Sequence, residues 1–481
     1  MNYSIVFYIL GWILNVEAAF MLLPCIVAVI YGETAGWCFP IVMGISFLIG
    51  TPLVIRKPKN TVFYTAEAFV AVSLGWILLS IMGGLPFLIS GYITNPVDAL
   101  FETVSGFTTT GASILTDVEV LPHCLLFWRS FTHWIGGMGV LVFILSLLPS
   151  LGGGGTHMNL MKAESPGPSV SRMLPTVKST AKILYEIYIG LTILQIILLL
   201  LGKMPLFDAL TITFGTAGTG GFAIKNSSMM DYSPYLQNVT TIFMILFGVN
   251  FNAYFFILIR KFRQAFGSEE VRSYLLIIAV SIAIITVNIM PMYSGLSESL
   301  RHAAFQVASI ITTTGYATTN FDEWPELSRA ILVLLMFIGA CAGSTGGGIK
   351  VSRVVILMKT ACKEMTQVLH PNAVKKVKMD GKLVEHEVVR STNVFLVVYL
   401  VIFAASVLLV SLDNFDAVTN FTAVAATFND VGPGLGMVGP VGNYSAYSNF
   451  SKLVLTFDML AGRLEIFPLL ILFSRDTWRK F

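Results

Sequence analysis

"FETVSGFTTTGASILTD", residues 101–117, interrupts an apolar chain with a run of threonines that ends on Gly111. A short amphipathic run comes before the threonines, and the acidic residues Asp117 and Glu119 come after them. The same layout returns in three later breaks: "FDALTITFGTAGTGGFA" (207–223), "LRHAAFQVASIITTTGYA" (300–317) and "FDAVTNFTAVAATFNDVGPG" (415–434). A hydrophobic span lies on each side of every break. The chain therefore divides into four span–short helix–loop–span units, and a repeat of this kind decides the fold.

The four copies share a spacing between a polar residue near the start of the short helix and a glycine. The two residues are thirteen apart in the first three copies and sixteen apart in the fourth: Asp98 and Gly111, Asp208 and Gly221, His302 and Gly315, Asp416 and Gly432. The fourth copy therefore has either three inserted residues or a slipped alignment.

The composition places the chain in a membrane. Of its 481 residues, 55% are hydrophobic and 12% are charged, whereas a soluble domain has roughly 25% charged residues. Apolar runs long enough to cross a bilayer, which needs about 20 residues in a helix, occur from end to end: Phe7–Ile30, Ile183–Leu201, Tyr274–Met290 and Val394–Leu412. These features predict an all-α polytopic membrane protein.

The distribution of charge predicts the orientation. Five breaks hold 23 of the 30 Lys and Arg residues: 56–60, 149–182, 260–272, 343–390 and the C-terminal tail. The positive-inside rule assigns these breaks to the cytoplasm, so the acidic end of the opening stretch lies outside. The N-terminus has no basic segment or cleavage site typical of a signal peptide, and we expect it to be a retained first span.

The four breaks have the parts of an ion filter. Non-helical backbone at membrane depth must line water or be buried in protein, and extended strands can turn their carbonyls inward to replace the hydration shell of a cation. Glycine permits the backbone angles that this requires, and the C-terminal end of a short helix directs its negative dipole toward the ion. A single Thr-Thr-Gly segment fits a helix-capping turn better. Four copies on one side of the membrane favour the filter.

Six blocks, in this order along the chain, resemble the Trk/Ktr/HKT superfamily of cation transporters, specifically its TrkH-type membrane subunit: "SGFTTTGAS", "RSFTHWIGGMG", "ITTTGYAT", "GSTGGGIK", "NDVGPGLG" and "AGRLEIF". The resemblance covers essentially the whole chain. It implies four tandem span–pore helix–span repeats around a pseudo-fourfold pore, with an extra N-terminal pair of transmembrane helices. The expected segments are the helix pair 1–60, pore repeat one 61–150, a cytoplasmic linker 151–178, repeat two 179–262, repeat three with an intramembrane gating loop 263–368, a cytoplasmic hairpin 369–390 and repeat four 391–481.

The resemblance also implies which residues bind potassium in the filter: Thr109, Thr110, Gly111, Thr219, Gly220, Gly221, Thr313, Thr314, Gly315, Asp430, Val431 and Gly432. In this superfamily, glycine at the key position of all four strands accompanies potassium selectivity, and serine in the first repeat accompanies sodium. The adjacent glycines of the second strand leave its register open by one residue.

A glycine-rich break, "GACAGSTGGGIK" (339–350), interrupts the second span of repeat three. Each interior glycine costs a helix roughly 1 kcal/mol relative to alanine, so a stiff helix is not expected here. By resemblance the break and one arginine form a gate below the filter: Gly343, Ser344, Thr345, Gly346, Gly347, Gly348, Lys350 and Arg463. Alternatives are a helix kink without gating duty, and an Arg463 that snorkels or pairs with Glu465, although an arginine within a span usually faces the bundle interior.

Two further features have structural interpretations. Asp380-Gly381 lies between short arms that alternate apolar and charged residues, which predicts a β-hairpin. Arg129 and His133 are spaced i, i+4 and share a helix face, and we expect them to anchor the filter or pack between repeats.

The resulting functional hypothesis is potassium uptake through a channel-like pore, in a multi-pass protein of the prokaryotic inner membrane. Resemblance implies a homodimer and a cytoplasmic nucleotide-binding regulator of the RCK type. The glycine-rich segments do not fit a nucleotide P-loop, and the spans have no metal-spaced or nucleophile–base constellation. We therefore expect no enzyme activity, no organic cofactor and no nucleic-acid partner, with K⁺ as the transported ion. The alternatives are a K⁺/H⁺ or K⁺/Na⁺ symporter, for which the filter blocks offer only Asp430 as a titratable group, and a less selective K⁺/Na⁺ pathway.

Overall fold

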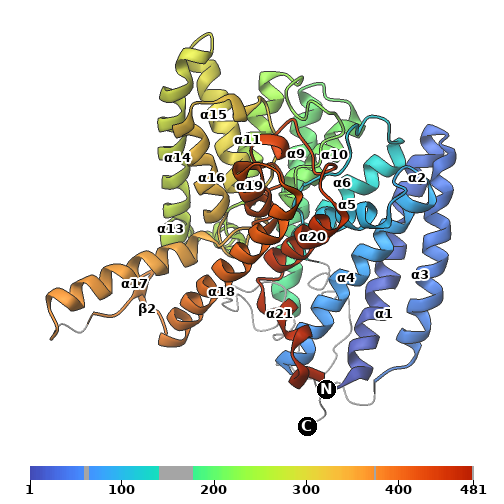
Figure 1. Ribbon diagram of the computed structural model, residues 1–481, viewed down its shortest axis with the longest axis horizontal. Helices are drawn as coiled ribbons and strands as arrows, with labels where there is room; N and C mark the ends of the chain where they lie inside the picture. The colour runs from blue at the N-terminus through green and yellow to red at the C-terminus, as the bar shows by residue number, and fades with distance from the viewer. Residues whose placement is uncertain (59–63, 140–176, 373–374, 479–481) are drawn as a thin grey trace.

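The computed structural model describes residues 1–58, 64–139, 177–372 and 375–478, most of them in helices (Figure 1). Among these residues, six segments are long and apolar enough to cross a membrane: Tyr3–Tyr31, Thr34–Ile55, Thr65–Ile89, Thr180–Leu201, Glu269–Met292 and His386–Asp413. The fold is that of a helical membrane protein, as the composition predicts. Nearly all of the expected linker 151–178 lies outside the described residues.

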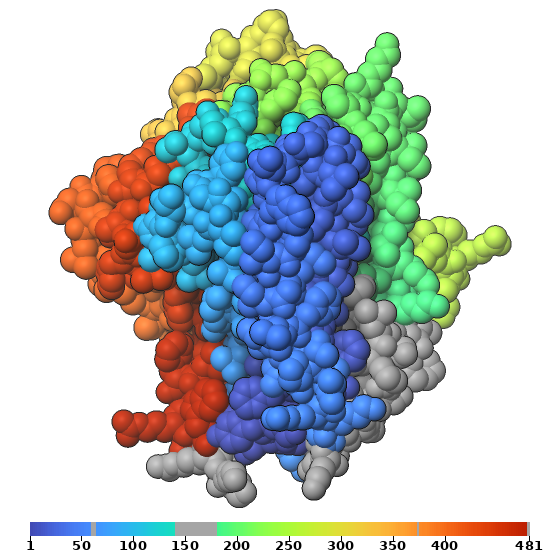
Figure 2. Space-filling view, turned by 90° about the vertical axis from the view of Figure 1, so that its right-hand side faces the viewer, coloured from blue at the N-terminus to red at the C-terminus, as the bar shows by residue number. Residues whose placement is uncertain are grey.

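The chain begins with a helix pair on one outer face, dark blue in Figure 2. The helices are α1 (Tyr3–Phe20) with its continuation α2 (Leu22–Tyr31), the turn η1 (Thr34–Trp37) and α3 (Cys38–Ile55). Glycines bring α1 and α3 together, since a Cβ added at Gly50 would lie 2.9 Å from the carbonyl oxygen of Gly11. Small residues allow such close packing of helices in a membrane.

Four units with the same order of elements follow: a long helix, a short helix, a non-helical strand and a second long helix. In chain order their helices are α4 (Thr65–Ile89), α5 (Pro96–Phe107) and α6 (His123–Met138); α9 (Val177–Leu201), α10 (Leu206–Gly218), α11 (Pro234–Phe247) and α12 (Phe251–Leu258); α14 (Glu269–Ile289), α15 (Leu296–Ile311), α16 (Glu326–Ile338) and α17 (Val351–Leu369); and α18 (His386–Val410), α19 (Ala417–Phe428), α20 (Asn449–Arg463) and α21 (Phe467–Leu470). The bend between α11 and α12 is 91°. The short helix α13 (Phe262–Gly267) links the second unit to the third.

The start of α19 explains the irregular spacing of the fourth copy. Asp416 is the N-cap of α19 and accepts a hydrogen bond from the backbone N–H of Thr419, whereas Asp98 is the third residue of α5. Thr419 therefore stands where Asp98 stands, thirteen residues before Gly432. The alignment had slipped, and no residues are inserted.

The third unit is broken in its second span, because α16 ends at Ile338 and α17 begins only at Val351. Beyond α17, which projects from the body (Figure 1), the strands β1 (Lys378–Met379) and β2 (Lys382–Leu383) pair antiparallel. Asp380 and Gly381 between them both have positive φ, at 51° and 75°, as the favoured two-residue hairpin turn requires. The Asp-Gly pair predicts this hairpin correctly.

Candidate ion-filter site

Each short helix of the four units ends in the same backbone turn. The first strand residue is left-handed, with φ between 56° and 60°: Thr109, Thr219, Thr313 and Asp430. The glycine two positions later also has positive φ, between 73° and 94°: Gly111, Gly221, Gly315 and Gly432. The residue between them donates its N–H to a carbonyl of its own helix at 2.8–2.9 Å: Thr110 to Ser105, Gly220 to Gly215, Thr314 to Ser309 and Val431 to Ala426. The backbone therefore fixes the register of strands two and four at Gly221 and Gly432.

The four strands close into a ring. A Cβ added at Gly111 would lie 2.0 Å from the carbonyl oxygen of Gly220 in the second unit. The same relation leads from the second unit to the third, from the third to the fourth and from the fourth back to the first: 1.8 Å from Gly221 to Thr314 O, 2.3 Å from Gly315 to Val431 O and 2.7 Å from Gly432 to Thr110 O. A side chain at any of these positions would collide with the neighbouring strand. The ring therefore depends on glycine in all four units.

A cavity opens on the outer side of the ring and is lined by all four glycines. Residues of the predicted outer mouth lie at its edge and connect the first two units. Asn226 donates its side-chain N–H to Asp117 at 2.7 Å and its backbone N–H to Glu119 at 3.0 Å. The acidic end of the opening stretch thus holds an outer loop.

The glycine-rich break lies against the inner side of the ring. The N–H of Gly347 donates to Thr313 Oγ1 at 2.7 Å, and the N–H of Gly348 donates to the carbonyl of Asn429 at 3.1 Å. A Cβ at Gly346 would lie 3.0 Å from the carbonyl oxygen of Thr312. The break therefore contacts the strands of units three and four.

The remaining residues of the break hold it to its surroundings. Gly343 accepts the N–H of Phe251 at 3.0 Å, and Ser344 Oγ donates to Cys341 O at 2.6 Å. Lys350 Nζ donates to the carbonyl of Gly346. These bonds join the break to α12 and to itself, so it is an ordered loop rather than a loose kink.

Arg463, the last residue of α20, lies below the first strand. Its Nη1 donates to Thr109 Oγ1 at 3.2 Å and to the carbonyl of Thr345 in the break at 3.0 Å. Its Nη2 donates to the carbonyls of Gly136 and, at 3.0 Å, Gly137 at the end of α6. Glu465, the alternative partner considered from the sequence, is paired with Arg353 of α17.

Arg129 and His133 brace the first two strands, as their helix spacing predicts. The buried Arg129 Nε lies 2.6 Å from Glu102 Oε1, and its Nη1 donates to the carbonyl of Ala223 at 2.9 Å. Glu102 in turn accepts the N–H of Ile114 at 2.9 Å. The ring of His133 stacks on Phe222 with centroids 4.2 Å apart.

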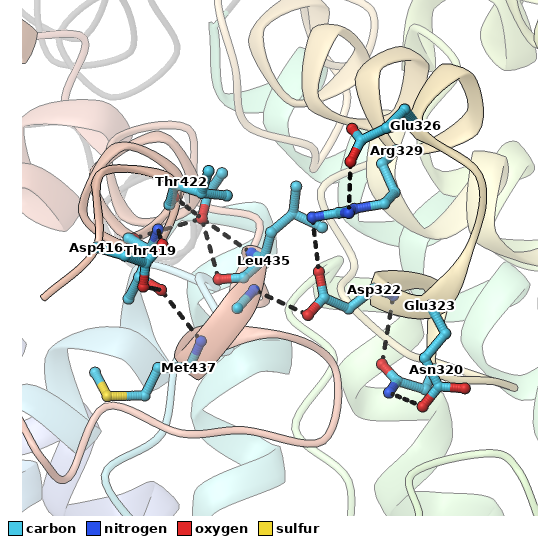
Figure 3. A network of polar contacts seen from close by, with 12 residues as sticks. Asn320, Asp322, Glu323, Glu326, Arg329, Asp416, Thr419, Thr422, Leu435 and Met437 are labelled. Carbon is cyan, nitrogen blue, oxygen red and sulfur yellow. Dashed lines mark hydrogen bonds and ion pairs between the residues drawn. The ribbon is translucent and has the colours of Figure 1, made fainter.

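Two residues of this frame were missed from the sequence. Glu102 could have been noticed as an acid inside a helix at membrane depth, which is costly unless it is paired. Asp322 gives no such signal, because it lies in the outer turn η3 (Phe321–Glu323). Its Oδ2 accepts the N–H of Gly436 at 3.1 Å, and its Oδ1 lies 3.3 Å from Arg329 Nη2 (Figure 3).

Thr419 and Thr422 of α19 complete this connection on the side of the fourth strand (Figure 3). Thr422 Oγ1 accepts the N–H of Leu435 at 2.9 Å, and Thr419 Oγ1 accepts the N–H of Met437 at 3.3 Å. The exit of the fourth strand is thereby held by its own helix and by the third unit.

The chain is similar to known proteins along its whole length. The family model TrkH, described as a cation transport protein, matches residues 40–480. The chain is 35% identical to the "Trk system potassium uptake protein TrkH" of Salmonella typhimurium and of Escherichia coli, each over 100% of both chains. It is 34% identical to TrkG of Escherichia coli over 99% of this chain and 98% of that protein. The crystal structure of the potassium transporter TrkH from Vibrio parahaemolyticus superposes with a TM-score of 0.88 at 33% identity, over 100% of both chains.

Proposed function

The chain belongs to the TrkH family of cation transport proteins, and from this premise we propose that it takes up potassium across the inner membrane. Its relatives are named as potassium uptake proteins, and it is a multi-pass transporter, not an enzyme. The observation that carries the proposal is the closed ring in which each of four glycines faces a carbonyl of the next strand.

The transport path is a channel-like pore through this ring. The backbone carbonyls of the four strands replace the water around K⁺. The short helices α5, α10, α15 and α19 end at the strands and direct their negative dipole ends toward the ion. The proposed ion ligands are Thr109–Gly111, Thr219–Gly221, Thr313–Gly315 and Asp430–Gly432.

The gate consists of residues 343–350 with Arg463. Hydrogen bonds from this group to Thr313, Asn429 and Thr109 support a state in which the inner side of the filter is closed. Arg463 adds a positive charge on the path, which raises the barrier for a cation.

A cytoplasmic regulator and a second copy of the chain complete the proposed system. The gate continues directly into α17 at Val351, and α17 leads to the hairpin outside the membrane. A nucleotide-binding regulator of the RCK type that contacts this surface would therefore pull on the gate. In the homodimer each protomer has its own pore.

Ion flux through purified protein in liposomes tests the proposal, with K⁺, Rb⁺ and Na⁺ compared. For Gly111→Ser we expect the preference for K⁺ over Na⁺ to fall roughly tenfold, which corresponds to ~1.4 kcal/mol of differential binding, because the new side chain meets Gly220 O. Gly91→Ser is the matched control, since Gly91 has the same φ of 79° and no described residue beyond its chain neighbours lies within 4 Å of its added Cβ.

If Gly111→Ser and Gly91→Ser had equal flux and equal K⁺/Na⁺ selectivity, the assignment of Gly111 to the filter would be wrong. The zero-current potential distinguishes a pore from a symporter: in a pore it follows the K⁺ gradient alone, and in a symporter it shifts with an imposed proton or sodium gradient.

A further inference from the structure

In three of the four strands the first residue lies against the proposed gate. Thr109 Oγ1 accepts from Arg463, and Thr313 Oγ1 accepts from the N–H of Gly347. In the fourth unit the same position is Asp430, and its Cβ would lie 3.0 Å from a Cβ added at Gly347. Two threonine hydroxyls and one carboxyl group thus border the gate, while Thr219 Oγ1 of the second strand donates to the carbonyl of Gly218 at 2.6 Å.

The carboxyl group of Asp430 is fully buried and only half satisfied. Its Oδ1 accepts a hydrogen bond from Thr110 Oγ1 of the neighbouring strand at 2.9 Å. Its Oδ2 accepts no hydrogen bond within the described residues, and it lies 3.1 Å from a Cβ added at Gly462. One oxygen is therefore held in place, and the other has no hydrogen-bond partner among the described residues.

The two cations of the proposed gate form hydrogen bonds with other groups. Arg463 hydrogen-bonds Thr109 and backbone carbonyls, and Lys350 donates to the carbonyl of Gly346. Both would leave the neighbourhood of Asp430 when the gate withdraws from the filter. A buried carboxylate without a partner is strongly disfavoured, and a bound cation removes that cost.

We propose that Asp430 Oδ2 forms a side-chain cation site at the cytoplasmic end of the filter, which receives the monovalent ion as it leaves the ring of carbonyls. This inference rests on the proposed potassium pore. In the closed state the positive charge of Arg463 occupies the same mouth, so the ion and the arginine compete for it.

Block by Ba²⁺ tests the site, because Ba²⁺ is close to K⁺ in size and a second charge strengthens its attraction to a carboxylate. K⁺ flux is measured in liposomes with Ba²⁺ on the cytoplasmic side. For each variant the flux is expressed as a fraction of its own flux without Ba²⁺, and the half-inhibiting Ba²⁺ concentration is read from that curve. For Asp430→Asn and Asp430→Thr we expect the half-inhibiting concentration to rise at least about tenfold. Threonine suits the backbone, since Thr109, Thr219 and Thr313 have φ of 58–60° at the same position.

Asp458→Asn is the control. Asp458 is also a buried acid, and one of its oxygens has no hydrogen-bond partner in the part of the chain that the structure describes. Its other oxygen accepts from Ser406 Oγ of α18 at 2.6 Å. Its replacement is expected to leave the Ba²⁺ response unchanged. The inference would be wrong if the wild type conducts K⁺ but has the same half-inhibiting Ba²⁺ concentration as both Asp430 variants. It would also be wrong if Ba²⁺ does not inhibit the wild type at all. Neither outcome would contradict the proposed pore. A wild type without K⁺ flux would instead overturn the proposed function.

A measurement on the wild type covers the case in which neither Asp430 variant folds. Anomalous scattering from crystals grown in Rb⁺ should reveal an ion beside Asp430 Oδ2, in the Arg463→Ala background if the closed gate excludes it. Rb⁺ within the ring of carbonyls and none beside Asp430 would refute the side-chain site alone.

Discussion

Several residues of the proposed filter adopt backbone angles that are unusual for their residue type. Threonine disfavours a left-handed backbone, and such a residue stores about 1–3 kcal/mol of strain, yet three threonines adopt it: Thr109, Thr219 and Thr313. The strain persists because each strand is fixed on one side by hydrogen bonds to its own helix and confined on the other side by the neighbouring strand. The glycines were identifiable from the sequence, but the strained residue before them was not.

Glu102 and Arg129 form a buried ion pair beside the first strand. Glu102→Gln leaves Arg129 buried without its counter-charge, and breaking a buried pair costs about 3–5 kcal/mol. We therefore expect the melting temperature in detergent to fall by several degrees, together with a lower K⁺/Na⁺ preference, because Glu102 also holds the N–H of Ile114.

Glu326→Gln is the control for that experiment, because Glu326 pairs with Arg329 while its side chain is 85% exposed. Exposed pairs contribute about 0–1 kcal/mol. Similar melting temperatures for the two variants would mean that the buried pair does not brace the filter.

At the scale of elements, the short helices agree best with the sequence. Their apolar faces, their caps and the glycines that follow them are local features, so spacing alone located them. The exceptions are also instructive. Asp416 is the N-cap residue of α19, whereas Asp98 and Asp208 are the third residues of α5 and α10. The helix α15 begins earlier, at Leu296, but His302 keeps the distance of thirteen residues to its glycine.

In the proposed gate, Arg463 joins α20 to the break, to α6 and to the first strand. Arg463→Ala removes these bonds and a positive charge from the path, and each ~1.4 kcal/mol taken from a barrier raises a rate tenfold. We expect K⁺ flux without any regulator to increase severalfold in liposomes. Arg463→Lys keeps the charge and should remain close to wild type, and a rate in Arg463→Ala no higher than in Arg463→Lys would argue against an electrostatic barrier.

Across the whole molecule, hydropathy was sufficient to predict a helical membrane protein, and the motif blocks were sufficient to predict the family. The orientation inferred from the charge distribution stays a prediction. The contacts between units were not predictable, because each joins residues far apart in the chain through side chains of different kinds. Arg129 reaches Ala223, Asp322 reaches Gly436, and no repeated motif marks them. A fourfold sequence pattern therefore predicts the ring but not the asymmetric frame that supports it.

The N-terminal helix pair lies outside the four units and packs on α4 through α1. Gly50→Val would overpack its contact with α1, at a cost of about 1–3 kcal/mol, and lower the melting temperature. The selectivity of K⁺ over Na⁺ should not change, because no residue of the pair lines the ring. Gly44→Val on the same helix is the control, as nothing lies within 4 Å of its added Cβ. A change of selectivity in Gly50→Val would mean that the pair shapes the pore.

The contact between Thr110 and Asp430 spans 320 positions of the chain, and it has a consequence for biosynthesis. The first strand leaves the ribosome long before its partner in the fourth unit is synthesised. Its contacts with the fourth strand can therefore form only after the last quarter of the protein has been translated. The proposed pore is therefore completed only by the last unit to be translated. We expect a chain truncated before the fourth unit to insert its helices without conducting ions.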